Sequence, residues 1–277
     1  MRIARCSSEG RSFWAVVDTA RHVAMPIRGQ FESWAPKVTL SRSEKSLELT
    51  GDEVALDQVR LLPPVEKASK VEVVGANYAR HLAELRLDGS SQPVVFLKAY
   101  GALIGGCDPI RYPPKTTKLD YEVELVVVVG AAPLSHEDPL SCVLGYTVGN
   151  DVSARDLQML GPRDISMDLF GAKSQDRTCG VGPWIVTADE FPEGQPNLKM
   201  EIRVNGETRQ SGESGEMTWT IAELLRFADE RSSLEPGDIL FTGTPEGVGH
   251  ASGRFLQRGD LVEAEIERIG TLENRVE

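Results

Sequence analysis

The stretch Lys118–Gly130, KLDYEVELVVVVG, constrains the fold of this chain more than any other segment. Its four consecutive valines, Val126–Val129, are typical of a strand that is covered on both faces. The segment before them carries Asp120, Glu122 and Glu124 at every second position. Side chains at this spacing point to the same side of a strand. The stretch therefore predicts a buried strand that begins with carboxylates on one face, which repel each other unless a positive group lies among them.

Most of the remaining sequence is also typical of β structure. Short segments rich in β-branched residues end at Gly, Pro, Asn or Asp, which favour turns. We expect strands within residues 71–78, 93–100, 123–130, 143–151, 182–189, 198–207, 237–245 and 260–270. Two segments predict helices instead, at 78–87 and 220–234. In the second, Thr220 and Glu223 form a capping-box pattern before an apolar stripe at helical spacing.

The first 64 residues predict a small N-terminal β domain. Strand-like segments at 11–18, 22–27 and 46–52 alternate with polar turns. Two prolines at 63 and 64, followed by polar residues, indicate a stiff connection. We therefore expect an N-terminal domain at 1–64 and a larger catalytic domain at 65–277, in a mostly β (α+β) fold.

Composition excludes several classes of function. The chain of 277 residues has a net charge of −12 and shows no basic run, so nucleic acid and anionic membranes are not expected as partners. No segment is apolar over the length of a membrane span, and the N-terminus lacks the apolar core of a signal peptide. The four cysteines are widely spaced, which indicates reduced thiols. We expect a cytoplasmic protein.

On spacing alone, Glu122 and Glu124 suit either a strand end in water or a metal site. A metal site is predicted if Asp151, which follows the strand-like segment YTVGN, lies across from them. Two unit charges about 4 Å apart repel by about 4 kcal/mol at an effective dielectric constant of ~20. Three carboxylates around one point therefore need a cation, and oxygen ligands favour Mg²⁺, Mn²⁺ or Ca²⁺. Asp120 lies one step earlier on the same face, and we expect it to be a supporting or surface residue.

Two further segments offer groups for acid–base and electrostatic catalysis. His81 and Glu84 are neighbours on the first predicted helix, where a carboxylate would orient the imidazole as a general base; a solvated polar face is the alternative. His250, in a glycine-rich loop, is the rival base. Lys173 follows Gly171 and Ala172 and is a candidate for stabilising a substrate oxygen, or simply an exposed lysine.

The order of these motifs resembles the fumarylacetoacetate hydrolase family. The resemblance covers about residues 71–277 and is carried by VVGANYARHLAEL, PVVFLKAY, LDYEVELVVVVG, GYTVGNDVSARDLQ, GAKSQDR and LEPGDILFTGTPEGVG. It implies a mixed β-sheet roll, a homodimer and a bound Mg²⁺ or Mn²⁺, with Ca²⁺ as a substitute in crystals. The segment before it resembles the small N-terminal domain of the longer members.

Carried over by position, the resemblance implies a role for each candidate residue. Glu122, Glu124 and Asp151 match metal ligands, and His81 with Glu84 matches the dyad that activates water in acylpyruvate-cleaving members. Lys173 matches the lysine that faces the substrate oxygens. Substrate contacts are implied for Gln158 and Thr244, and Lys98 matches a recurrent lysine that we group with them. Independently of the resemblance, the glycine-rich loop after the strand at 237–245 predicts backbone amides near Gly243 that bind a substrate anion.

The activity expected first is metal-dependent hydrolysis of a C–C bond in an acylpyruvate- or fumarylacetoacetate-like diketo acid. The same site would also suit decarboxylation of oxaloacetate, or isomerisation and tautomerisation of a 2-hydroxydienoate, because each passes through an enolate that a metal stabilises. A different class stays open: a non-catalytic relative that binds a ligand or a pathway partner.

Overall fold

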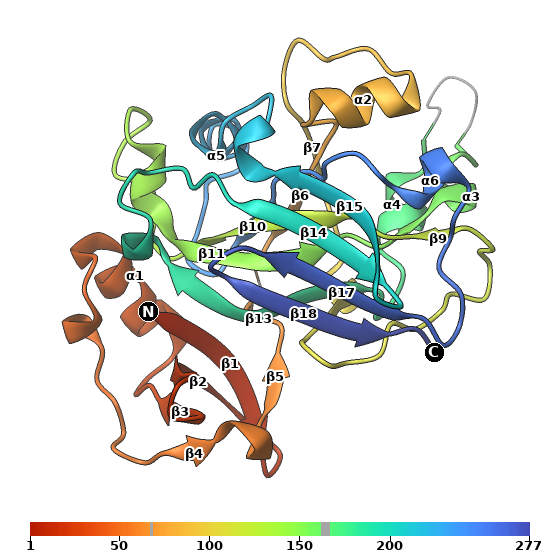
Figure 1. Cartoon of the computed structure of the whole chain (residues 1–277). Helices are drawn as coiled ribbons and strands as arrows, with labels where there is room; N and C mark the ends of the chain where they lie inside the picture. Colours follow the sequence, from red (N-terminus) through yellow and green to blue (C-terminus); the bar gives the residue numbers. More distant parts are fainter. Residues whose placement is uncertain (67–68, 162–166) are drawn as a thin grey trace.

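The computed structural model describes residues 1–66, 69–161 and 167–277, and in these residues the protein is mostly β, as predicted (Figure 1). A large mixed sheet has the strand order β4-β3-β2-β1-β13-β11-β10-β16-β6-β7, with β5 beside β1 and β8 beside β13. Its strands are β1 (Arg2–Ser8), β2 (Arg11–Asp18), β3 (Val23–Pro26), β4 (Val54–Ala55), β5 (Arg60–Leu62), β6 (Val71–Gly75), β7 (Val94–Leu97), β8 (Leu103–Ile104), β10 (Val123–Val129), β11 (Val143–Asn150), β13 (Cys179–Thr187) and β16 (Ile239–Phe241).

A second sheet packs against the large one. Its strand order is β15 (Glu207–Glu213), β14 (Lys199–Val204), β17 (Leu261–Ile266) and β18 (Gly270–Arg275), and β9 (Leu119–Asp120) pairs separately with β12 (Ser153–Ala154). Along β14, Met200, Ile202 and Val204 are buried while the residues between them are partly exposed. This alternation is the period of a strand with one face on a core. β15 and β18 were not predicted, since each is largely polar.

Strand β10 is buried on both faces, as its valine run predicts. Val127 and Val129 belong to the apolar cluster that includes Met200 and Ile202 of the second sheet. Val126 and Val128 belong to the cluster on the other face, which includes Phe31 and Trp34 of α1 (Phe31–Ser41). The strand that carries Glu124 is therefore held in place by packing from both sides.

The helices are short and lie around the sheets: α1, α2 (Ala79–Leu85), α3 (Arg155–Gln158), α4 (Leu169–Lys173), α5 (Ile221–Asp229) and α6 (Gly249–Ser252). Short 3₁₀ turns occupy Glu44–Ser46, Leu56–Gln58, Tyr100–Ala102, Pro139–Cys142, Ala188–Glu190 and Ser214–Glu216. The predicted helices correspond to α2 and α5, and the capping box between Thr220 and Glu223 is formed in both directions. Within the described ranges, no helix combines the length and apolar character needed to cross a membrane.

The N-terminal region differs from its prediction in several elements, since β1, β4 and β5 were not among the predicted strands. Residues 31–41 form α1, although no helix was expected there, and the strand predicted at 46–52 is reduced to an isolated bridge between Ile27 and Leu49. Pro36 lies inside α1 and lacks the N–H of a helical hydrogen bond. Burial of the apolar face of α1 outweighs this loss, because tertiary packing commonly overrides local propensity.

The first strand joins the N-terminal region to the rest of the large sheet. β1 pairs with β13 in antiparallel register, with Arg2 opposite Val186 and Ile3 opposite Ile185. In Figure 1 the red and orange N-terminal strands continue into the green strands of the main body. The connection predicted at 60–70 includes residues 67–68, which lie outside the described residues, and the boundary at 64 stays a prediction.

Candidate metal centre and active site

The pairing of β10 with β11 brings the predicted carboxylates together. The two strands are antiparallel, with Glu124 opposite Gly149, so the start of β10 lies beside the end of β11. Glu122 immediately precedes β10, Asp151 immediately follows β11, and the Asp151 amide donates to the Glu122 carbonyl at 2.8 Å. The register of one strand pair therefore places acids that are far apart in the sequence at one point.

The three carboxylates form a donor set that fits a hard divalent cation. Glu122, Glu124 and Asp151 are all buried, and each offers an oxygen within 4.8 Å of the other two. Buried carboxylate oxygens are the ligands that Mg²⁺ and Mn²⁺ prefer. The predicted proximity of these side chains is confirmed, while their role as metal ligands stays a prediction.

The positive charges near the cluster favour ionisation of Glu122 more than ionisation of Glu124. Burial raises the pKa of Glu124 well above its usual range, and the charges of Asp151 and Glu122 raise it further. Burial also opposes ionisation of Glu122, but Lys173 and Arg155 outweigh it and hold the pKa of Glu122 at about 2. A divalent cation at this point would supply the charge that lets Glu124 ionise.

Lysine and arginine side chains balance part of the negative charge. Lys173, at the end of α4, places Nζ 2.5 Å from Glu122 Oε2 and 2.6 Å from Asp151 Oδ2. Burial alone would lower the pKa of Lys173, but Asp151 and Glu122 raise it above its usual value, so the ammonium stays charged. Lys173 is therefore a buried member of the site and not an exposed lysine.

The predicted histidine–glutamate dyad is formed on α2. His81 Nδ1 lies 2.8 Å from Glu84 Oε1, and the Gly247 amide donates to both oxygens of Glu84, at 3.2 and 3.0 Å. Because a carboxylate accepts hydrogen bonds, His81 Nδ1 carries the proton and Nε2 is the basic nitrogen. His250 contributes its backbone N–H to Asp120 at 2.8 Å and does not line the cavity that His81 lines.

His81, Glu122 and Glu124 line one cavity of about 240 Å³. Its polar wall consists of His81, Glu122, Glu124, Arg155, Gln158, Lys173 and Thr244. The apolar wall comes from β6, α2, β7 and the region around α4. A basic nitrogen, an acidic oxygen cluster and a buried ammonium therefore face the same enclosed space, which is an arrangement suited to moving protons on a bound oxyacid.

The residues predicted to contact substrate occupy different places. Thr244 and Gln158 line the cavity, and Thr244 Oγ1 also donates to the Val123 carbonyl at 2.8 Å. The Gly243 amide donates to Glu124 Oε2 at 2.7 Å, so it supports an acid of the cluster. Lys98 is buried with Nζ 2.6 Å from Asp151 Oδ1, and it also donates to the Lys173 carbonyl.

Two residues support the acidic cluster: Arg155, which was not identified from the sequence, and Asp120, which was expected to be a supporting or surface residue. Arg155 on α3 donates to Glu122 Oε1 at 2.5 Å, to Asp120 Oδ2 at 2.8 Å and to Gln158 Oε1 at 3.3 Å. Asp120 is fully buried, not at the surface, and also accepts from the Gly249 amide at 2.6 Å. The signal for Arg155 was its place four residues after Asp151, but its partners belong to segments that only the fold brings together.

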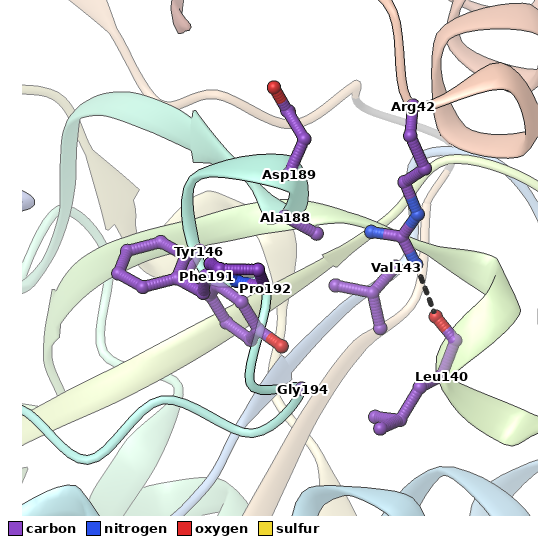
Figure 2. A pocket seen from close by; sticks show the side chains of 9 residues that line it. All are labelled: Arg42, Leu140, Val143, Tyr146, Ala188, Asp189, Phe191, Pro192 and Gly194. Atoms are coloured by element: carbon purple, nitrogen blue, oxygen red, sulfur yellow. Dashed lines mark hydrogen bonds between the residues drawn. The ribbon is translucent and has the colours of Figure 1, made fainter.

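A second cavity, of about 330 Å³, lies at the other end of β11, near the N-terminal region (Figure 2). Figure 2 shows the Arg42 guanidinium directed into it, donating to the Leu140 carbonyl at 3.2 Å, with the rings of Tyr146 and Phe191 beside it. None of the predicted catalytic, substrate or metal residues lines this cavity. The candidate site is therefore the cavity around His81.

Comparisons with known proteins agree with this geometry. Residues 70–277 match the sequence model of the fumarylacetoacetate (FAA) hydrolase C-terminal domain, and residues 1–64 match an Rv2993c-like N-terminal domain. A Bacillus subtilis protein named oxaloacetate tautomerase YisK is 37% identical over 282 residues, which cover 99% of this chain and 86% of the relative.

Solved structures of related proteins share the fold of this chain. A Mycobacterium smegmatis 5-carboxymethyl-2-hydroxymuconate delta-isomerase superimposes with a TM-score of 0.81 at 34% identity, over 100% of this chain and 99% of the other. A Pseudomonas aeruginosa fumarylpyruvate hydrolase in complex with Mn²⁺ and pyruvate has a TM-score of 0.68 at 32% identity, over 78% and 91% of the two chains. The sequence match, the shared fold and the acidic cluster lead to one conclusion: this chain belongs to the fumarylacetoacetate hydrolase family.

Proposed function

We propose that the protein is a Mg²⁺- or Mn²⁺-dependent enzyme that interconverts the keto and enol forms of 2-keto acids carrying a second carbonyl group beyond the adjacent carbon. The observation that carries the proposal is that His81, whose Nδ1 is paired with Glu84, lines one cavity together with Glu122 and Glu124 of the acidic cluster. The tautomerase name of the Bacillus subtilis relative supports this reaction over the others expected from the sequence.

The reaction needs a base, a positive group that stabilises negative charge on the substrate oxygens, and a cavity that excludes bulk water. A divalent cation held by Glu122, Glu124 and Asp151 would polarise the substrate carbonyl groups and take up negative charge that develops on their oxygens. His81 Nε2 removes the proton from the carbon between the carbonyl groups, and Glu84 stabilises the resulting imidazolium. His81 then returns the same proton to a substrate oxygen, so no proton is gained or lost overall.

Hydrolysis of a C–C bond, the activity expected first from the sequence, is the second candidate. The same dyad would deprotonate a water molecule that adds to the distal carbonyl carbon, and cleavage of the adjacent C–C bond would give pyruvate and a carboxylic acid. The Mn²⁺ and pyruvate bound to the Pseudomonas aeruginosa neighbour favour keeping this candidate. Both candidates require His81 as a base. Decarboxylation of oxaloacetate requires no attacking water, so it does not need His81 in that role.

The test uses purified protein with Mn²⁺, with Mg²⁺ and with EDTA, on oxaloacetate and on acetylpyruvate. Enol absorbance follows tautomerisation, and proton NMR of the same samples follows acetate, pyruvate and loss of CO₂. We expect tautomerisation that depends on the metal. Inertness toward both substrates under all three conditions would contradict the proposal and favour a binding relative.

Two histidine variants locate the base. His81→Gln should lower the tautomerisation rate by about 10²–10⁴-fold, the usual contribution of a positioned base. His136→Gln is the matched control, because His136 lies on the surface, with Nδ1 3.9 Å from Asp229 Oδ2, and does not line the cavity. An unchanged rate in His81→Gln would remove His81 from the mechanism.

A further inference from the structure

The cavity around the acidic cluster has a second, apolar half. Leu82 and Leu85 of α2, Val94 and Phe96 of β7, and Leu169 of α4 line the cavity along with the polar groups. α2 and β7 lie together at one end of the molecule in Figure 1. The catalytic groups therefore open into a space with hydrocarbon walls, and this apolar subsite is part of the same cavity.

Apolar side chains also remain exposed at the rim of the apolar subsite. Leu87 is 47% exposed and Val94 is 41% exposed, although both line the cavity. Scattered exposed leucines are ordinary, but a group of them around a cavity is typical of a surface that a ligand covers. The exposure points to an apolar group of the ligand that removes these side chains from water.

The charges around the cavity argue against a second acidic group on the substrate. Among the described residues that line it, the cations are Arg155 and Lys173. Arg155 is held by Asp120 and Glu122, and Lys173 by Glu122 and Asp151. A carboxylate placed against the apolar walls would lose its hydration without gaining a free cationic partner from the described lining residues, which is strongly unfavourable.

We propose that the apolar subsite binds an uncharged alkyl or aryl tail, so that the preferred substrates are 2-keto acids whose distal end is hydrophobic and not a second carboxylate. This inference rests on the proposed function, since it assumes that the keto acid end lies at the acidic cluster. The inference predicts a substrate preference that differs from that of relatives named for oxaloacetate, because the distal end of oxaloacetate is a carboxylate.

Binding measurements test the inference without catalysis. Calorimetry on the Mn²⁺-loaded protein compares pyruvate, 2-oxobutanoate, 2-oxohexanoate and 2-oxooctanoate with the dicarboxylate 2-oxoglutarate. We expect the affinity to rise about three- to fourfold for each added methylene until the apolar subsite is filled, as transfer of methylene groups from water predicts. A flat series, or 2-oxoglutarate binding as tightly as 2-oxohexanoate, would overturn the inference.

Two variants on one strand locate the apolar subsite. Val94→Lys adds a cation at its rim and should shift the preference from 2-oxohexanoate toward 2-oxoglutarate by at least about tenfold. Leu97→Lys is the matched control, because Leu97 lies on the same edge strand, is 61% exposed and does not line the cavity. Equal effects of both variants on the preference would contradict the placement.

The outcomes separate this inference from the proposed function. If Val94→Lys does not fold, Leu87→Lys tests the same rim from the segment that follows α2. An affinity series that rises with tail length in a protein that tautomerises nothing would remove the proposed reaction and keep the apolar subsite. Tautomerisation that is equally fast for oxaloacetate and for long acylpyruvates, together with a flat affinity series, would keep the proposed reaction and remove the apolar subsite.

Discussion

Glu72 offers a direct test of the electrostatics of this fold, because it is an acid buried in the large sheet. It lies on β6, is only 4% exposed, and its Oε2 has no hydrogen-bond partner among the described residues. Burial raises the pKa of Glu72 from 4.5 to about 7, and the nearby charge of Asp238 adds to the rise, while Lys70 opposes it. Replacing Glu72 by Gln removes the ionisation and keeps the shape.

The size and sign of the effect follow from this pKa. A folded-state pKa above the unfolded value means that the folded protein holds the proton more tightly. The stability that this carboxyl group contributes is fully present below about pH 4.5 and is lost as the pH rises to about 7. At about 1.36 kcal/mol for each pKa unit, the loss at pH 8 is roughly 3 kcal/mol.

Thermal unfolding of Glu72→Gln and the parent protein at pH 5 and pH 8 measures the effect. The variant should gain little at pH 5 and roughly 6 °C in Tm at pH 8, at about 2 °C for each kcal/mol. Glu201→Gln is the control of opposite sign: burial opposes its ionisation, but hydrogen bonds from Arg203 and Lys199 lower the pKa of Glu201. The same Tm difference between Glu72→Gln and the parent at both pH values would refute the reasoning.

Three other predictions follow from the site and the fold. Glu124→Gln should change the Tm of the metal-free protein little, because the raised pKa of Glu124 favours its neutral form, which Gln resembles. It should abolish most of the Tm increase caused by Mn²⁺, and a full Mn²⁺ effect would exclude Glu124 as a ligand. Glu84→Gln should lower the tautomerisation rate by roughly 10- to 100-fold, while calorimetry should show an unchanged Mn²⁺ affinity. Equal rates in the variant and the parent protein would show that the charge of Glu84 is not needed. Thr220→Ala should cost about 1 kcal/mol of unfolding free energy in denaturant titrations through loss of the cap to Glu223, whereas Thr218→Ala, outside the cap, should not.

The sequence predicted those parts of the site that depend on one strand pair. The spacing of Glu122 and Glu124 predicted side chains on one side of a strand, although β10 begins only at Val123. Asp151 was expected just past the next strand-like segment, and the structure shows that this segment, β11, pairs with β10. Short strands such as β18 escaped prediction because half of their residues face solvent and read as loop. α1 escaped because Pro36 and the β-branched residues after it hid the helical spacing of its buried side chains.

The supports of the site were not predictable in the same way. Arg155 donates to Glu122, and the Gly247 amide donates to Glu84, although these partners are far apart in the sequence. Asp120 was expected as a supporting or surface residue, but its pairing with Arg155 was not predicted. Local propensity and spacing carry no information on which loop ends meet. The homodimer and the cytoplasmic location expected from the sequence also stay predictions, and light scattering of the purified protein tests the first.

The pairing of β1 with β13 has a consequence for anyone who shortens this protein. A chain cut at residue 64 would lose β1 and β5, and so would bare the backbone N–H and C=O groups of β13 along Ile185 and Val186. An exposed strand edge of this kind pairs with strands of other molecules. A truncated enzyme would then self-associate even with every catalytic group intact, and its insolubility would say nothing about its chemistry.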